Sequence, residues 1–350
     1  MKILRLHSCF KLNNKSFLNK DELLDYTKLN LPEIYTFLKE WFDASDFVTV
    51  KTSGSTGKPK QIQLKKEYMM NSALATGKFF NLPDKTTALL CMPLKFIAGK
   101  MMLVRALVLG WHLDVIEATT NPLKNVDRKY DFSAMVPLQL YNSLDNIHWI
   151  KKIIIGGGAV SDDLISKIKT IPTEVYASYG MTETITHIAV KPLNVAAGFT
   201  DKNNFFKTLP DVEISKDHRD CLVIDAIRVS NNQIITNDLV DIISSNEFEW
   251  IGRFDNIINS GGIKLIPEKI EQKLSNFISQ RFFITGLPDD VLGEKAVLLI
   301  EGSNLKIDLD RFKSILAKYE VPKEVYFIDN FVETVTKKIQ RQKTLDLIKL

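Results

Sequence analysis

Residues 51–60 read Lys-Thr-Ser-Gly-Ser-Thr-Gly-Lys-Pro-Lys, a stretch without an apolar side chain to anchor it in a core. Glycines allow close backbone approach, so consecutive N–H groups can converge on an anion while hydroxyl groups add further donors. The pattern predicts a phosphate-binding loop. An ordinary surface turn is the alternative, because Gly, Ser and Pro also dominate turns. The expected donors are Ser53, Gly54, Ser55, Thr56 and Gly57.

The spacing within this stretch excludes the common P-loop pattern. Only two residues separate Gly54 from Gly57, and Pro59 stands where a Ser or Thr would hold magnesium. Residues 47–52 alternate apolar and polar side chains and predict a strand that leads into the loop, and residues 61–64 predict the returning strand of a hairpin. The loop is therefore expected to be a phosphate loop of another kind.

The composition is that of a globular protein, because 45% of the 350 residues are apolar and 25% are charged. A net charge of +4 is too small an excess to indicate a nucleic-acid partner. Cys9, Cys91 and Cys221 are odd in number and far apart, which favours a reducing compartment. Residues 1–17 lack the apolar run of a secretory signal, and the apolar run 101–111 is too short to span a bilayer. We expect a cytoplasmic protein without a membrane span.

Strand and helix patterns alternate along most of the chain, which predicts an α/β sheet with ligands at the carboxyl ends of its strands. A helix at 31–42 precedes this region. The expected strands are 87–92, 112–116, 132–136, 153–155 and 174–178, and the expected helices are 66–80, 99–109 and 161–169.

The pattern changes from about residue 212, where short strands at 221–224 and 233–235 are expected. A compact α+β domain is expected after residue 252. Its expected helices are 267–278 and 308–319, and its expected strands are 282–285, 296–300 and 324–328. We therefore predict a large domain at 1–253, in which 1–46 is a shortened N-terminal region, and a small domain at 254–350.

A second chemical cluster follows the strand predicted at 174–178. Tyr179, Thr182 and Glu183 offer a ring that can stack on a base, a hydroxyl for a phosphate and a carboxylate for magnesium. Taken alone, residues such as Tyr179 and Thr182 more often simply pack and cap.

Six such stretches occur in one order: 51–60, the glycines 156–158, 179–183, 236–239, 252–255 and 336–341. This order resembles the adenylate-forming superfamily of acyl-CoA synthetases, adenylation domains and luciferases, over about residue 47 to the C-terminus. The resemblance implies a large α/β domain of layered sheets and helices followed by a small mobile α+β domain. It also implies ATP, Mg²⁺, coenzyme A and a small carboxylic acid as ligands, and it is compatible with a homodimer.

The resemblance assigns the nucleotide site residue by residue. Lys60 joins the loop around the ATP phosphates, Thr182 contacts the α-phosphate and Glu183 holds magnesium. Asp238 is similar to the aspartate that binds both ribose hydroxyls. The remaining residues implied at the nucleotide are Gly157, Gly158 and Ala159 on the adenine side, Tyr179 as the stacking ring, its neighbours Gly180 and Met181, and Arg253 near the ribose or phosphate.

The resemblance also assigns the moving parts. Asp255 matches the hinge between the domains, and Lys338 the lysine that reaches the substrate carboxylate and the α-phosphate. A carboxylate that attacks an α-phosphate joins two anions, so the site must supply positive charge there. In the second step a thiol displaces AMP, and the loop with Gly261, Gly262 and Lys264 would line the thiol channel.

Three positions depart from the superfamily pattern. Lys337, Asn237 and Gln61 stand where relatives have glycines. The missing glycines motivate an alternative in which the protein binds a nucleotide without catalysis, although the presence of both Glu183 and Lys338 argues against it. Fewer residues precede the phosphate loop than in most relatives.

Residues 92–105 match the segment beside the acyl pocket, with Phe96 in place of the usual histidine. Together with residues 182–187, this segment is similar to o-succinylbenzoate–CoA ligases of menaquinone biosynthesis. The expected pocket residues are Phe96, Gly99, Lys100, Arg105 and His187, of which the three basic residues are candidates for a non-reacting carboxylate. Arg105 could instead pair at a helix surface, and His187 could be a core histidine. Another aryl or fatty acid, or a carrier protein in place of coenzyme A, also remains open.

Overall fold

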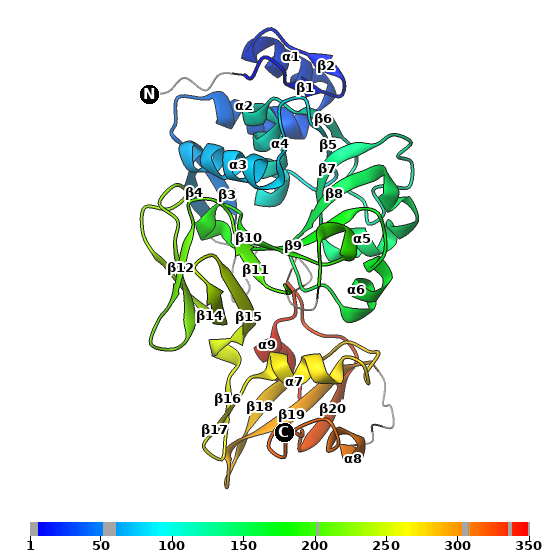
Figure 1. Ribbon diagram of the computed structural model, residues 1–350, viewed down its shortest axis with the longest axis vertical. Helices are drawn as coiled ribbons and strands as arrows, with labels where there is room; N and C mark the ends of the chain where they lie inside the picture. Colours follow the sequence, from blue (N-terminus) through cyan, green and yellow to red (C-terminus); the bar gives the residue numbers. More distant parts are fainter. Residues whose placement is uncertain are drawn as a thin grey trace.

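The computed structural model describes residues 6–51, 61–200, 203–302, 307, 309–334 and 338–348. The predicted phosphate loop, with Ser53, Gly54, Ser55, Thr56, Gly57 and Lys60, lies outside these residues, as does Lys337. The described chain forms a large sheet with its helices and, below it in Figure 1, a smaller sheet that carries the C-terminus. The two sheets share no strand.

The large sheet has 13 strands in the order β12-β13-β14-β15-β11-β10-β9-β8-β7-β5-β6-β1-β2. Neighbours from β6 to β9 pair in parallel, and the strands from β9 to β12 pair antiparallel. The strands are β1 (Lys11–Leu12), β2 (Lys15–Ser16), β5 (Thr87–Leu90), β6 (His112–Val115), β7 (Tyr130–Met135), β8 (Ile150–Ile155), β9 (Glu174–Gly180), β10 (His187–Pro192), β11 (Phe206–Thr208), β12 (Glu213–Lys216), β13 (Cys221–Asp225), β14 (Ile234–Ser244) and β15 (Glu247–Arg253).

Helices cover both faces of the parallel part, as Figure 1 shows. Alternate residues of β5 face opposite cores: Ala88 and Leu90 join one apolar cluster with α3 and α4, and Leu89 joins another with α5 and α6. The helices of this part are α1 (Lys20–Asn30), α2 (Pro32–Phe42), α3 (Lys66–Phe80), α4 (Ile97–Leu109), α5 (Pro137–Asn142) and α6 (Asp162–Ile168), with 3₁₀ turns η1 (Leu144–Trp149), η2 (Thr182–Thr184) and η3 (Val195–Ala197). The predicted α/β alternation is confirmed.

A separate hairpin flanks the predicted phosphate loop. β3 (Phe47–Lys51) and β4 (Gln61–Lys65) pair antiparallel, from Phe47 opposite Lys65 to Lys51 opposite Gln61. The hairpin predicted from residues 47–52 and 61–64 is therefore present in the structure.

The smaller sheet has five strands and a core on each face. α7 and α8 pack on one face, and Phe331 and α9 pack on the other. The elements are β16 (Ile258–Ser260), β17 (Ile263–Leu265), α7 (Pro267–Leu274), β18 (Phe282–Asp289), β19 (Gly293–Glu301), α8 (Leu309–Phe312), β20 (Glu324–Ile328) and α9 (Arg341–Leu345). The 3₁₀ turn η4 (Phe254–Asn256) connects β15 of the large sheet to β16.

Two predicted helices of this part are too long. The helix predicted at 267–278 ends at Leu274, and the one predicted at 308–319 ends at Phe312. Residues 313–315 continue as turns whose N–H groups bond three residues back, so the apolar spacing there reflects packing rather than a continuous α-helix. Within the described residues, no helix is both long and apolar enough to cross a bilayer.

Candidate active site

Two segments with candidate site residues leave the large sheet at the same edge. β8 and β9 are parallel neighbours, with Ile155 opposite Ala177. Gly157, Gly158 and Ala159 follow β8 and are exposed, and Thr182 and Glu183 follow β9. Ser178 donates a hydrogen bond to the Ile155 carbonyl at 2.9 Å and ties the two strand ends together. The structure thus brings the predicted adenine and phosphate segments to one edge, hereafter the β8–β9 edge.

The segment after β9 turns back sharply. The Thr186 N–H donates to the Thr184 carbonyl at 2.7 Å across Ile185, whose φ is +66° and ψ is −58°. This is a γ-turn of the strained kind, and a positive φ is rare for a β-branched residue. Sequence reasoning missed it. The turn is stabilised by burial of Ile185 and by the Thr184 hydroxyl, which donates to the carbonyl oxygens of Met181 and Thr186.

Gly180 is needed for the same reversal. A Cβ placed there would lie 2.2 Å from the Thr186 carbonyl oxygen and 2.5 Å from the His187 Cα. Both are backbone atoms, so they cannot move aside as a flexible side chain could. The return strand β10 therefore passes directly beside β9 and carries His187 to a position opposite Gly180.

Glu183 is exposed at this edge, and its carboxylate has no hydrogen bond or ion pair among the described residues. Within the same residues no cluster of three metal-ligating side chains exists. Magnesium is commonly held by one or two carboxylates together with substrate phosphates, so a single free carboxylate fits this mode of binding.

Asp238 is 6% exposed, and both its carboxylate oxygens have partners. Tyr179 donates its hydroxyl to Oδ2 at 2.6 Å, and Trp250 Nε1 and Arg253 Nη1 donate to Oδ1 at 3.2 and 3.3 Å. Burial, and next the Asp238 charge, raise the pKa of Tyr179 far above its usual range, so its hydroxyl stays a donor. The structure thus joins three predicted nucleotide residues, and adds Trp250, which sequence reasoning missed.

The predicted hinge residue Asp255 lies in η4, directly after Arg253 and Phe254. It accepts hydrogen bonds from Arg253 at 3.0 Å and from the Asn237 amide at 3.1 Å to each carboxylate oxygen. Arg219 in turn donates to Asn237 Oδ1 at 2.9 Å. The contacts of Asn237 and Arg219 were not foreseen from the sequence.

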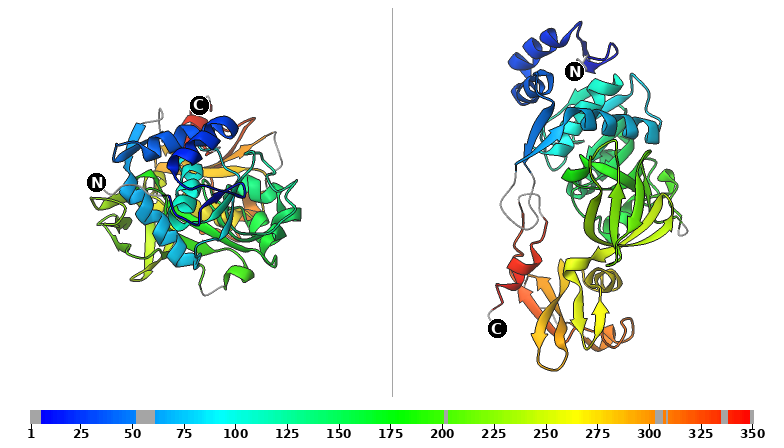
Figure 2. Two further views of the ribbon diagram at one scale, coloured as in Figure 1. Left: turned by 90° about the horizontal axis from the view of Figure 1, so that it is seen from above. Right: turned by 90° about the vertical axis from the view of Figure 1, so that its left-hand side faces the viewer.

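Lys338 is exposed, and residues 338–339 pair antiparallel with residues 333–334; these two paired segments are hereafter the Lys338 hairpin. Glu333 bridges Ile339, and Thr334 and Lys338 exchange hydrogen bonds through their N–H groups. Figures 1 and 2 show that the described residues between β20 and α9 extend from the small sheet toward the large one. Arg341, just after the hairpin, forms a two-bond ion pair with Glu271 of α7 at 2.7 and 2.8 Å.

Gly261 and Gly262 form the β16–β17 turn with positive φ values of +59° and +81°. The Gly261 N–H donates to the Leu292 carbonyl, so this turn lies beside the β18–β19 turn. Figure 1 places these turns at the end of the small sheet that points away from the large one. Lys264 is exposed on β17. The structure therefore separates the predicted thiol-channel residues from the β8–β9 edge.

A buried basic cluster lies under this edge. Arg105 is 1% exposed; its Nε donates to Thr76 Oγ1 at 3.3 Å, and its Nη2 lies 3.4 Å from His187 Nδ1. Burial lowers the pKa of Arg105 to about 9. Burial, and next the Arg105 charge, lower the pKa of His187 well below its usual range, so the imidazole is neutral. No carboxylate of the described residues pairs with Arg105, and the surface pairing considered from the sequence is wrong.

The other predicted acyl-pocket residues are not part of this cluster. Lys100 lies 4.6 Å above the Phe37 ring, and burial lowers its pKa. Phe96 directly precedes α4 and its side chain makes no capping hydrogen bond, and Gly99 faces the carbonyl of Pro93, where a Cβ would come within 2.4 Å. The structure therefore brings Arg105 and His187 together but turns Lys100 away from them.

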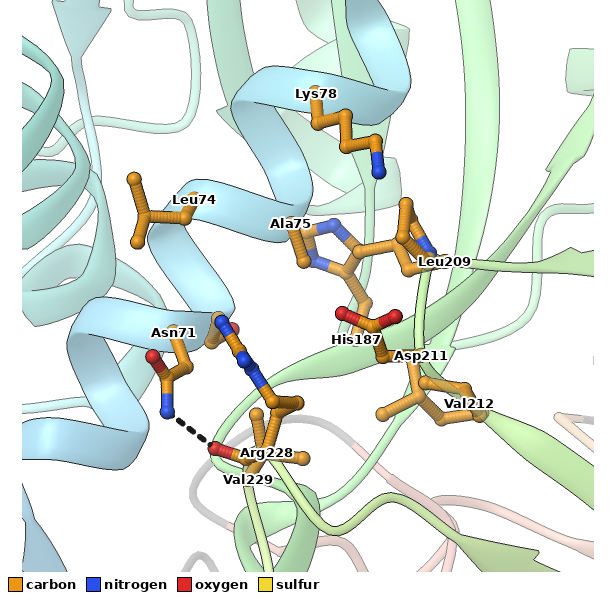
Figure 3. Close-up of a pocket in the computed structure, with 13 residues that line it drawn as sticks. Asn71, Leu74, Ala75, Lys78, His187, Leu209, Asp211, Val212, Arg228 and Val229 are labelled. Atoms are coloured by element: carbon orange, nitrogen blue, oxygen red, sulfur yellow. Dashed lines mark hydrogen bonds between the residues drawn. The ribbon is translucent and has the colours of Figure 1, made fainter.

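A cavity of about 170 Å³ lies beside His187, between α3 and the loops after β11 and β13. Figure 3 shows charged side chains from both sides, with Lys78 from α3 and Asp211 and Arg228 from the opposite loops. His187 is the one predicted acyl-pocket residue that lines it. The cavity thus touches the basic cluster through His187.

Known proteins with similar sequences point to one family. The sequence pattern of the AMP-binding enzyme family matches residues 10–214. The 2-succinylbenzoate–CoA ligase of Geobacillus sp. (strain WCH70) is 24% identical over 91% of this chain and 72% of its own length. The ligase of the same name from Bacillus cereus (strain Q1) is 25% identical over 91% of this chain and 74% of its own length.

Solved structures agree with this fold. An acyl-CoA synthetase (AMP-forming)/AMP-acid ligase II-like protein from Dyadobacter fermentans is 38% identical, covers 91% of this chain and 95% of its own, and has a TM-score of 0.62. The o-succinylbenzoate coenzyme A synthetase of Bacillus subtilis, solved with ATP and magnesium, covers 85% of this chain and 69% of its own, with a TM-score of 0.73 at 20% identity. The adenylate-forming α/β architecture expected from the order of motifs is confirmed, and the chain belongs to the AMP-binding enzyme family.

Proposed function

We propose that the protein is an ATP-dependent acid–CoA ligase whose acid carries a second carboxylate, and that this acid is o-succinylbenzoate. The observation that carries the substrate assignment is Arg105, a buried cation beside a neutral His187 and without an acidic partner among the described residues. An unpaired buried charge is costly, and a ligand carboxylate would complete the pair with two parallel hydrogen bonds. The two sequence relatives described above are 2-succinylbenzoate–CoA ligases, which supports the same substrate.

The cluster is well placed for this role. His187 lies opposite Gly180 in the sheet, and Gly180 precedes the Thr182–Glu183 segment by two residues. An acid whose second carboxylate meets Arg105 would therefore extend its reacting carboxylate toward the β8–β9 edge. Thr76 and His187 would hold the guanidinium in place while it binds the substrate.

In the first step, the reacting carboxylate attacks the α-phosphorus of ATP, a C–O–P linkage forms and pyrophosphate leaves. Thr182 would donate to the α-phosphate, Glu183 would hold Mg²⁺, and Asp238 would accept the ribose hydroxyls. Magnesium, when bound, neutralises charge on the phosphates. Lys338 would supply positive charge where the two anions meet, and no general base is needed because the nucleophile is already a carboxylate.

In the second step, the thiol of coenzyme A attacks the acyl carbon, AMP leaves and a thioester forms. We propose that residues 254–350 turn about Asp255 between the two steps, so that the Lys338 hairpin withdraws and Gly261, Gly262 and Lys264 approach the acyl group. The two groups of residues lie at opposite ends of the small sheet, as this exchange requires. The substrates and the lone cysteines Cys9, Cys91 and Cys221 suit a cytoplasmic enzyme.

The test is pyrophosphate release from ATP and Mg²⁺ with o-succinylbenzoate, compared with benzoate and a fatty acid, each with and without coenzyme A. We expect release and a thioester with the dicarboxylate. Pyrophosphate release with benzoate or the fatty acid, but not with o-succinylbenzoate, would overturn the substrate assignment. In a further assay a phosphopantetheinylated carrier protein replaces coenzyme A, and acyl transfer to the carrier only would overturn coenzyme A as the acceptor.

Arg105→Met keeps the length of the side chain and removes its charge. We expect the KM for o-succinylbenzoate to rise about 100-fold, as for loss of a charged, hydrogen-bonded contact, while the KM for ATP stays within about two-fold. Lys100→Met is the matched control because Lys100 faces Phe37 instead. Equal effects of both substitutions would show that Arg105 has no special contact with the acid.

A further inference from the structure

The connection between the two sheets is short, and its side chains contact both units: Asn256 of η4 donates a hydrogen bond to Glu268 of α7 at 2.5 Å, while the two residues before it contact the large sheet. η4 (Phe254–Asn256) follows β15 directly, and β16 begins two residues later at Ile258. Both side chains at the start of η4 contact the large sheet or its turns. The Arg219 guanidinium lies 5.1 Å from the Phe254 ring centroid, and Asn237 of β14 binds Asp255. A change in the orientation of the small sheet must alter these contacts.

The contact between Asn237 and Asp255 is a fork. Asn237 Nδ2 lies 3.1 Å from each carboxylate oxygen of Asp255, so a single amide holds the whole carboxylate. Hydrogen bonds to a charged acceptor are stronger than those between neutral groups. A glycine at position 237, as the superfamily pattern has it, would leave Asp255 with only its bond to Arg253 among the described residues.

Arg219 fixes the direction of this amide. It donates from Nη1 to Asn237 Oδ1 at 2.9 Å and from Nη2 to the Thr236 carbonyl at 3.0 Å, and Asp217 pairs with it at 2.7 Å. Because the amide oxygen faces a cation, its NH₂ group must face Asp255. Asp217, Arg219, Asn237 and Asp255 therefore form one continuous chain of hydrogen bonds.

This chain begins beside the nucleotide site. Asn237 directly precedes Asp238, and Arg253 binds Asp238 at 3.3 Å and Asp255 at 3.0 Å. Asp238 could bind the ribose hydroxyls, and Asp255 could act as the hinge, without the Asn237 amide beside them. We propose that Asn237 is a positioning residue that holds η4 against β14 and so stabilises the arrangement in which the Lys338 hairpin faces the large sheet.

The consequence for catalysis rests on the proposed function. In the proposed function, adenylate formation uses the arrangement in which the Lys338 hairpin faces the large sheet, so loss of the Asn237 amide should slow that step. Thioester formation needs the other arrangement and should not slow. Substitution of Asn237 should therefore slow one half-reaction only, whereas substitution of a residue that only stabilises the fold would slow both.

The first experiment needs no substrate. Hydrogen exchange of the segment 253–258, measured by mass spectrometry on the full chain, should become roughly ten-fold faster in Asn237→Ala, as expected for loss of two charge-assisted bonds. Asn237→Asp, which places a carboxylate against Asp255, should have a larger effect. Asn246→Ala is the matched control, because Asn246 lies at the other end of the β14–β15 hairpin and contacts Ser244. Unchanged exchange in Asn237→Ala, or an equal change in Asn246→Ala, would overturn the proposal.

Arg219→Gln provides a second variant if the substitutions in β14 impair folding, since the Arg219 side chain is 27% exposed. It should accelerate the same exchange by a smaller factor, because the amide remains but is no longer oriented. If Arg219→Gln folds correctly and the exchange rate of residues 253–258 is unchanged, Arg219 does not orient the Asn237 amide, and the proposal is overturned.

The second experiment separates the half-reactions. In Asn237→Ala, pyrophosphate release with o-succinylbenzoate should fall several-fold, whereas coenzyme A should convert the preformed acyl adenylate at the wild-type rate. Equal losses in both steps would overturn the positioning role. If wild-type protein releases no pyrophosphate with any acid tested, the proposed function fails, and the exchange experiment alone decides the role of Asn237.

Discussion

The β8–β9 edge and the Lys338 hairpin carry complementary parts of the proposed reaction but are built in different ways. At the edge, backbone hydrogen bonds and buried side chains such as Thr184 and Ile185 fix each turn. The hairpin is exposed at Lys338, and an ion pair between Arg341 and Glu271 holds its base to α7. The β9–β10 reversal can thus be changed only at the cost of the fold, whereas the exposed Lys338 can be replaced while both cores stay intact.

The largest effect is expected from removing the charge on the hairpin. Lys338→Ala should lower pyrophosphate release roughly 10²–10³-fold, comparable to loss of one preorganised electrostatic contact to a transition state. ATP binding, measured by calorimetry, should stay within about three-fold, because the edge residues are unchanged. Lys343→Ala in α9 is the control, since it removes a lysine of the same unit outside the hairpin. Turnover equal to wild type would exclude Lys338 from the reaction.

Gly180→Ala tests the rigidity of the edge. Its Cβ would collide with backbone atoms of Thr186 and His187, and overpacking of this kind costs about 3 kcal/mol of unfolding free energy. The measurement is the urea midpoint of the full chain. Gly158→Ala at the same edge is the matched control, because nothing lies within 4 Å of a Cβ there. Equal midpoints for the two variants would show that the β9–β10 reversal is not tightly constrained.

The sequence predicted many of the helices and strands but few of the side-chain contacts between them. α3 and β20 occur at their predicted bounds because their apolar residues keep the spacing of a helix or strand. For β14 the apolar pattern predicts only residues 233–235, since Thr236, Asn237 and Asp238 interrupt it. These polar residues are in a strand because their side chains have partners from distant segments.

Those partners could not be predicted from local pattern. Trp250 and Arg219 meet Asp238 and Asn237 only after three antiparallel strands align, and nothing in their own neighbourhoods indicates which residue lies opposite. The γ-turn at Ile185 has no sequence signal either, because an isoleucine is an unusual residue at positive φ. Motif order predicts the candidate site residues, while their mutual contacts depend on sheet register.

Arg341→Ala tests whether the ion pair just after the Lys338 hairpin positions the hairpin. Loss of the ion pair with Glu271 should slow adenylate formation about ten-fold and leave thioester formation from preformed adenylate unchanged, because the hairpin loses its fixed direction. Arg341→Lys should recover part of the rate. Lys273→Ala, which removes a surface pair with Glu320 in the same unit, should leave both steps unchanged. Equal slowing of both steps by Arg341→Ala would indicate a purely structural role.

The smallest expected effect is on the pH dependence of the unfolding free energy. It comes from His187, which is buried beside the edge, whereas Lys338 on the hairpin is exposed. His187 stays neutral in the folded protein because burial and Arg105 lower its pKa, whereas in the unfolded chain it titrates near the usual value of about 6.5. Below about pH 6.5 the unfolded state therefore binds a proton that the folded state does not. His187 should make stability fall with decreasing pH by up to about 1.4 kcal/mol per unit.

His187→Gln keeps a polar side chain at this position and removes the titration. Urea unfolding between pH 5 and 7 should show a shallower loss of stability in the variant than in the wild type, by at most one proton in the slope. Identical slopes would mean that His187 takes up its proton in the folded state as well. The imidazole would then be a second cation beside Arg105, and the acid pocket would carry more positive charge than the geometry assigns to it.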